Sequence, residues 1–105
     1  MINWDRISEL QDEVGEDGIA EVIEIFVEEM EEGLASLASS SNPTEIADKL
    51  HFLKGSAQNI GLEEMSRLCA AGEHALRIDA AHQPDVDAIR TSLQHAQSEL
   101  KALTD

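Results

Sequence analysis

Four long stretches of this sequence each carry one row of apolar residues spaced three or four positions apart. This spacing is that of an α-helix with one face turned to a core and the other to water. The stretches cover about residues 17–38, 43–60, 63–79 and 84–103, and a shorter helix is expected over about residues 4–13. Runs of alternating apolar and polar residues, which indicate strands, do not occur. The fold class is therefore predicted to be all-α.

Short polar connections separate the predicted helices. Asn42 is expected to cap the helix that begins at Pro43, and Gly61 is expected to end that helix. Four amphipathic helices with short connections are typical of an antiparallel up-down four-helix bundle. We expect the bundle over about residues 17–103, with the shorter helix as an additional N-terminal cap, and the whole chain, 1–105, as a single domain.

Each apolar row also predicts the side chains that face the core. In the short helix they are Trp4, Ile7, Leu10 and Val14. In the four long helices they are Ile19, Ile23, Phe26, Met30, Leu34, Leu37, Ile46, Leu50, Leu53, Ala57, Ile60, Met65, Leu68, Cys69, Gly72, Ala75, Leu76, Val86, Ile89, Leu93, Ala96, Leu100 and Leu103. Cys69 is the single cysteine, which excludes an internal disulfide and a cysteine-based zinc site. Its thiol is expected to pack in the core.

Acidic residues dominate the charge of the chain. There are 22 acidic and 7 basic residues, which give a net charge of −15. Such a chain is repelled by phosphate backbones and by anionic lipid surfaces, so nucleic-acid and membrane binding are excluded as main functions. No apolar run is long enough for a membrane span, and the N-terminus lacks the pattern of a signal peptide. With a lone cysteine, these features predict a cytoplasmic protein.

The most informative residues for function surround His51. This histidine lies one position after the apolar row, about 100° around the helix from it, so it is expected at the surface. Its neighbours on that face are Ala47, Lys54, Gly55 and Gln58. Glycine inside a helix costs about 0.8–1.0 kcal/mol relative to alanine, so Gly55 suggests that open space beside the imidazole matters more than stability.

These residue types suit phosphoryl transfer. A neutral imidazole is a nucleophile near pH 7, and a nearby ammonium stabilises the anionic oxygens of a phosphoryl group. The chain contains no nucleotide-binding loop and no kinase motif, so the donor is expected to be another protein or a small phosphodonor. A lone histidine on a helix surface is by itself weak evidence for this chemistry.

The run His51–Ala57, followed by Gly61, resembles the signature of the histidine phosphotransfer (HPt) domain of multistep phosphorelays. The resemblance extends along the whole chain and implies a role for each matching residue. His51 would accept the phosphoryl group, Lys54 and, as a weaker assignment, Gln58 would stabilise it, and Gly55 would let a partner approach. Ala47, which neighbours His51 on the same face of the helix, is expected to belong to the same approach surface.

The same resemblance implies partners and their chemistry. A receiver domain of a response regulator, or a hybrid sensor histidine kinase, would exchange its aspartyl phosphate with the histidine, and Mg²⁺ would sit on the receiver. The chain itself would have no cofactor, no metal and no ATPase or autokinase activity. A monomer is expected. The positions of the first and last helices favour a separate small protein, although a domain cut from a hybrid kinase would look the same.

Three alternatives stand beside this interpretation, and residue spacing argues against the two that involve a metal. The first is a non-catalytic helical adaptor that binds signalling partners without being phosphorylated. The second is a di-metal carboxylate bundle, which is rejected because the sequence lacks Glu-x-x-His and its glutamates lie off the apolar rows. The third is a metal site built from His74, His82 and His95, whose spacing does not predict convergence. Arg77 either flanks His51 or pairs with Glu73 or Asp79.

Overall fold

The computed structural model of this protein describes residues 2–104. This part of the chain forms five helices: α1 (Trp4–Val14), α2 (Glu16–Ser39), α3 (Pro43–Asn59), α4 (Glu63–Ile78) and α5 (Val86–Thr104). Its one β-type pairing is an isolated bridge between Ile2 and Leu62. The all-α prediction is confirmed, and the predicted helix bounds differ from these by at most two residues.

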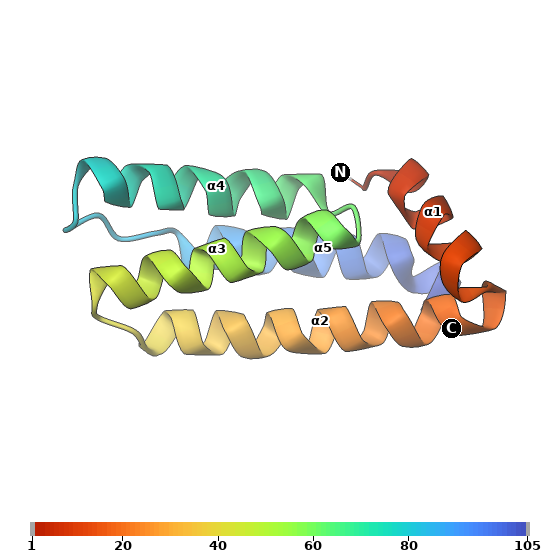
Figure 1. The fold of residues 1–105 in the computed structure, drawn as a ribbon. Helices are drawn as coiled ribbons and strands as arrows, with labels where there is room; N and C mark the ends of the chain where they lie inside the picture. Colours follow the sequence, from red (N-terminus) through yellow and green to blue (C-terminus); the bar gives the residue numbers. More distant parts are fainter. Residues whose placement is uncertain (1, 105) are drawn as a thin grey trace.

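Figure 1 shows the four long helices running lengthwise beside one another, with α1 lying across one end. Helix α3 packs against α2 and α4, and α5 packs against the same two helices. The contacts therefore place α2, α3, α4 and α5 in a ring, in which the α2–α5 edge lies opposite the α3–α4 edge. The short α1 packs mainly on α2. Within residues 2–104, no helix combines the length and apolar character needed to cross a bilayer.

The core lies along the axis of this ring. Most of the predicted inward residues are buried, and Phe26, Leu68, Val86 and Leu103 are partly buried against the core. The prediction was wrong for Trp4 and Val14, which are 48% and 40% exposed. Because α1 lies across the end of the molecule, the other helices cover the middle of its apolar row more fully than its two ends. Its buried residues are Ile7 and Leu10.

The helix starts follow their capping residues. The Asn42 side chain accepts hydrogen bonds from the backbone N–H groups of Thr44 (2.8 Å) and Glu45 (3.3 Å), as predicted. Asn3 caps α1 by accepting from the N–H of Arg6 at 3.2 Å. These contacts satisfy donors that have no partner inside the helix. They fix where α3 begins, and with it the position of the central histidine.

Gly61 follows the end of α3 and also bonds to the N-terminal segment. Its backbone is in the left-handed region, with φ +73°, and its carbonyl oxygen accepts a hydrogen bond of 2.7 Å from the N–H of Asn3. The Arg6 side chain adds a bond of 2.9 Å to the carbonyl oxygen of Asn59. The turn between α3 and α4 therefore holds the N-terminal segment in place.

Replacing Gly61 with alanine is expected to lower the free energy of unfolding by more than about 1–2 kcal/mol, the usual cost of a left-handed backbone for a residue with a Cβ. The new Cβ would also lie 2.7 Å from the carbonyl oxygen of Asn3. Urea unfolding measures the change. Gly55→Ala is the control, because its Cβ would meet no atom within 4 Å. It should raise stability by up to about 0.8–1.0 kcal/mol. Equal midpoints for the two variants would contradict this account.

Candidate functional site

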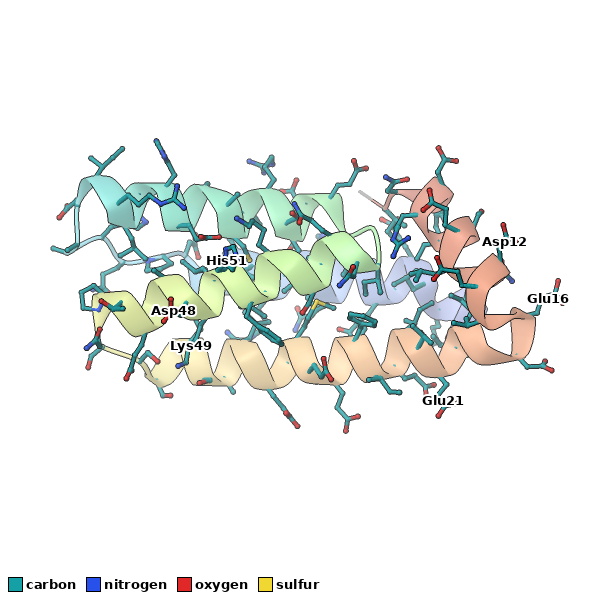
Figure 2. All side chains as sticks on the ribbon, viewed as in Figure 1. Asp12, Glu16, Glu21, Asp48, Lys49 and His51 are labelled. Atoms are coloured by element: carbon teal, nitrogen blue, oxygen red, sulfur yellow. The ribbon has the colours of Figure 1, made fainter. Side chains whose placement is uncertain are left out.

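His51 lies in the middle of α3, and its side chain is 71% exposed. Figure 2 shows the imidazole on the side of α3 that faces α4. The expectation that this residue lies at the surface is confirmed. The position follows from the sequence, because the neighbouring Leu50 and Leu53 are fully buried and turn the His51 position outward.

A buried carboxylate from α4 contacts the imidazole. The Glu73 side chain is only 8% exposed, and its Oε2 lies 3.3 Å from His51 Nδ1. Its other oxygen, Oε1, lies 2.9 Å from the Nζ of Lys54. The guanidinium of Arg77 approaches Oε2 at 3.7 Å. The Glu73 carboxylate of α4 therefore contacts the side chains of both His51 and Lys54 on α3.

Glu73 remains ionised despite its burial. Burial alone would raise the pKa of this carboxyl group, but the Lys54 ammonium, followed by His51, outweighs that effect and holds the pKa of Glu73 below its ordinary value. An ionised carboxylate accepts hydrogen bonds and cannot donate them. A neutral His51 therefore carries its proton on Nδ1, and this N–H donates a hydrogen bond to Oε2 of Glu73. The lone pair is left on Nε2, the nitrogen that does not face Glu73.

The contribution of Glu73 to the free energy of unfolding should decrease as the pH falls. Since its pKa is depressed in the folded protein, the ionised carboxylate stabilises the fold above its unfolded pKa of about 4.3. This contribution is lost as the pH falls through the lower, folded pKa. We expect Glu73→Gln to be destabilised relative to the wild type at pH 7 and the difference to narrow below about pH 4. A difference in urea midpoint that is constant over this range would contradict the assignment.

The other predicted site residues lie along the same face of α3. A Cβ on Gly55 would meet nothing within 4 Å, so the space beside His51 is open as expected. Ala47 is half-buried, and Gln58 is exposed about two turns beyond His51. Within residues 2–104, Gln58 makes no side-chain hydrogen bond to the imidazole. Lys54, which is 24% exposed, is engaged with Glu73 rather than free in solvent.

A hollow of about 450 Å³ opens between α3 and α4 beside His51. Ala47, Asp48 and Arg77 line it together with His51 and Glu73. Figure 2 shows Asp48 one turn before His51 along α3. Two of the positions predicted for Arg77 are therefore found together, since Arg77 pairs with Glu73 and also flanks His51. The imidazole lies at the edge of a recess that is open to another molecule.

The sequence did not predict that Glu73 contacts His51. It suggested Glu73 only as an ion-pair partner of Arg77. The statement that the glutamates lie off the apolar rows is wrong for this residue. Glu73 stands four positions after Cys69 and three before Leu76, and all three side chains are buried. A charged residue inside an apolar row was the available signal.

The remaining candidate ligands lie apart. His74 is on α4, His82 is in the connection to α5, and His95 is on α5. Within residues 2–104, no three His, Cys, Asp or Glu side chains are placed to hold a metal ion. Cys69 is buried as predicted, and this burial raises the pKa of its thiol to about 12, which keeps it protonated and unreactive.

Comparison with known proteins gives one result. The family model described as "Hpt domain" matches residues 21–104, which is 84 of the 105 residues. The match includes α3 and α4 and therefore His51, Lys54 and Glu73. Searches among curated proteins and among solved structures found no match.

Proposed function

Because this chain belongs to the Hpt domain family, we propose that His51 accepts a phosphoryl group from the aspartyl phosphate of one receiver domain and passes it to another. Membership of this family gives the chain a phosphotransfer role in a two-component phosphorelay, with receiver domains and histidine kinases as partners. The observation that carries the residue assignment is the contact of 3.3 Å between His51 Nδ1 and the buried Glu73. It supports Nε2 as the nucleophile on an exposed ring.

The proposal includes the scaffold on which this site is built. We take α2 to α5 to form an antiparallel up-down four-helix bundle with α1 as a cap, in a monomeric chain that is a single domain. The ring of helix contacts and the shared core support this arrangement. In it, α3 and α4 pack directly against each other, so the imidazole and the carboxylate that orients it come from two neighbouring helices.

The chemical step needs little from the chain itself. The Nε2 lone pair of His51 attacks the phosphorus of the aspartyl phosphate, a P–N bond forms, and the P–O bond to the aspartate breaks with its electrons leaving on the carboxylate. The proton on Nδ1 stays in place. Positive charge develops on the imidazole as the P–N bond forms, and the ionised Glu73 stabilises that charge. The reverse step returns the phosphoryl group to a second receiver.

Lys54 has two tasks in this proposal. Its ammonium compensates the charge of Glu73 in the resting protein, at 2.9 Å. It also lies one turn from His51, where it can contact the oxygens of the bound phosphoryl group. Gln58, one turn further, is proposed as a weaker contact. The chain supplies no ATPase or autokinase activity, no metal and no cofactor, while the receiver brings Mg²⁺.

The approach of the receiver depends on the open space at Gly55. Gly55→Leu is expected to leave the helix intact, because leucine is a better helix former than glycine. It should slow transfer from a phosphorylated receiver at least about tenfold by filling the space beside the imidazole, equivalent to about 1.4 kcal/mol of barrier. Ala102→Leu, at an exposed site on α5, is the matched control and should transfer at the wild-type rate. A wild-type rate for Gly55→Leu would remove Gly55 from the approach surface.

The test of the proposal is transfer from a panel of receiver domains carrying a radiolabelled phosphoryl group. Wild-type protein should take up label that is labile in acid and stable in alkali, and His51→Gln should take up none. His74→Gln, on the exposed side of α4, is the control histidine and should accept label normally. Label that persists in His51→Gln would overturn the assignment. Wild-type protein that binds receivers without being labelled would favour the non-catalytic adaptor.

A further inference from the structure

Glu73 is a buried carboxylate that faces three side chains able to carry a positive charge. The Lys54 ammonium is the nearest of them, at 2.9 Å from Oε1, while His51 and Arg77 lie 3.3 and 3.7 Å from Oε2. A buried carboxylate needs a positive charge beside it, because taking an ion out of water is costly. While the imidazole is neutral, Lys54 is the main source of that charge.

The contact between Lys54 and Glu73 is a contact of charges and not a well-aligned hydrogen bond. Oε1 of Glu73 is buried, and the ammonium lies 2.9 Å from it. Within residues 2–104, however, this oxygen receives no hydrogen bond of acceptable geometry. The attraction between two charges depends on their distance and sign, whereas a hydrogen bond also depends on the direction of the donor. Another cation beside the same carboxylate can therefore take the place of Lys54.

Phosphorylation turns the imidazole of His51 into such a cation. As Nε2 forms the P–N bond, the P–O bond to the receiver aspartate breaks and its electrons leave on the carboxylate. The ring keeps its Nδ1 proton and gains a positive charge, 3.3 Å from Oε2 of Glu73. The phosphoryl oxygens bring negative charge to the other side of the ring, one helical turn from Lys54. The need for the ammonium therefore falls at Glu73 and rises at the phosphoryl group.

We propose that Lys54 exchanges partners during transfer: it pairs with Glu73 while the ring is neutral, and it moves to the phosphoryl oxygens when the phosphorylated ring compensates Glu73. This inference rests on the proposed function, since it concerns the same histidine. The buried carboxylate keeps a positive charge beside it in both states, so transfer in either direction avoids an uncompensated buried charge. When the P–N bond breaks, its electrons return to Nε2, the ring leaves as a neutral imidazole, and Lys54 returns to Glu73.

The other charged groups around His51 are poorly placed for this exchange. Besides Glu73, the charged residues that line the hollow are Asp48 on α3 and Arg77 on α4, and no residue of α2 or α5 lines it. Asp48 carries the wrong sign. Arg77 is 73% exposed and lies 3.7 Å from Oε2, so water screens its contact with Glu73. Lys54 combines the shortest contact with a side chain that is 24% exposed, which gives its ammonium a path to the surface.

The first test makes the ring positive by protonation. Lys54→Met should lower the urea midpoint at pH 8, and the loss should shrink to about half at pH 5.5, because an unperturbed imidazole takes up a proton near about pH 6.5. In the folded variant this proton also compensates Glu73, so it is bound more tightly than in the unfolded chain. The added stability is present below about pH 6.5 and is lost as the pH rises further. Burial raises the pKa of the nearby Cys69 thiol to about 12, so that group does not titrate in this range.

Two control variants identify the source of this recovery. Lys49→Met should have the same small effect at both pH values, because Lys49 is on the same helix but has no ion pair within residues 2–104. His51→Gln/Lys54→Met lacks the ring and should not recover at pH 5.5. An equal recovery in this double variant would mean that Glu73 itself takes up the proton, and it would overturn the proposal. A Lys54→Met loss of the same size at both pH values would do so too.

The second test follows the Lys54 side chain by NMR at pH 8. In the resting protein, a nuclear Overhauser cross-peak is expected between the side-chain CH₂ protons of Lys54 and Glu73, whose charged groups lie 2.9 Å apart. Phosphorylation of His51 with phosphoramidate, a small donor that replaces the receiver, should remove this cross-peak. The cross-peak between Arg67 and Glu64, an ion pair of 2.8 Å on α4, should remain.

His51→Gln treated with phosphoramidate should keep the cross-peak between Lys54 and Glu73, because its side chain cannot become a cation. If the cross-peak persists in protein phosphorylated on His51, Lys54 does not change partners and the proposal is wrong. Receivers that fail to phosphorylate His51 would instead contradict the proposed function. The two failures are distinguishable, because neither the pH comparison nor the phosphoramidate reaction uses a receiver.

Discussion

Lys54→Ala is expected to lower the free energy of unfolding by about 3 kcal/mol, the lower end of the range for removing one partner of a buried ion pair. The reason is Glu73, which is only 8% exposed and loses its contact of 2.9 Å to the Lys54 ammonium. His51 and Arg77 cannot fully replace that charge, because their side chains are 71% and 73% exposed and turned largely to water. Urea unfolding at pH 7 measures the change.

Lys49→Ala is the matched control for this loss. Lys49 lies on the same helix and is also partly buried, but it has no ion pair within residues 2–104. Its removal should change stability by no more than about 0.5 kcal/mol. The double variant Lys54→Met/Glu73→Leu should recover most of the loss, because replacing both charges with apolar side chains leaves nothing uncompensated. A Lys54→Ala protein as stable as Lys49→Ala would show that Glu73 does not need this partner.

Glu73→Gln should slow phosphoryl transfer to His51 about tenfold or more. The amide is similar in shape to the carboxylate and can still accept the Nδ1–H, but it cannot stabilise the positive charge that develops on the ring. A hydrogen bond to a charged group contributes about 1–1.5 kcal/mol more than a neutral one, which corresponds to roughly a tenfold change in rate. The rate is measured with a labelled receiver domain held in excess.

Two controls separate this effect from a general loss of structure. Glu63→Gln changes an exposed glutamate of the same helix and should transfer at the wild-type rate. Circular dichroism should show the same helix content for both variants. Glu73→Asp keeps the charge but shortens the side chain, so its rate should fall between those of Glu73→Gln and the wild type. A Glu73→Gln protein that transfers as fast as the wild type would remove Glu73 from the mechanism.

Helix positions could be predicted well because amphipathic periodicity is a local property of the sequence. The apolar row from Ile46 to Ile60 determines which residues of α3 are buried, and it thereby places His51 on the surface. Lys54 and Gly55 follow from the same helix geometry, since all three residues lie within two turns. A site that lies along one helix can therefore be recognised from spacing and from resemblance to a family.

Glu73 could not be placed in the same way, because its contact with His51 joins residues 22 positions apart on different helices. The rotation of α4 against α3 decides whether that carboxylate meets the imidazole or water, and sequence spacing does not define this rotation. The prediction that Trp4 is buried was wrong for a related reason. Periodicity identified the apolar face of α1 correctly, but how much of that face is covered depends on how the helix crosses the end of the molecule.

We propose that Glu73 accepts a hydrogen bond from the Nδ1–H of His51, which leaves Nε2 of this exposed ring as the phosphoryl acceptor. Protein labelled with ¹⁵N in its histidine rings can be phosphorylated by a receiver domain and examined by ³¹P and ¹⁵N NMR. We expect a phosphorus coupling to Nε2 of His51 and to no other histidine nitrogen. A phosphoryl group on Nδ1 of His51, or on His74, His82 or His95, would contradict it.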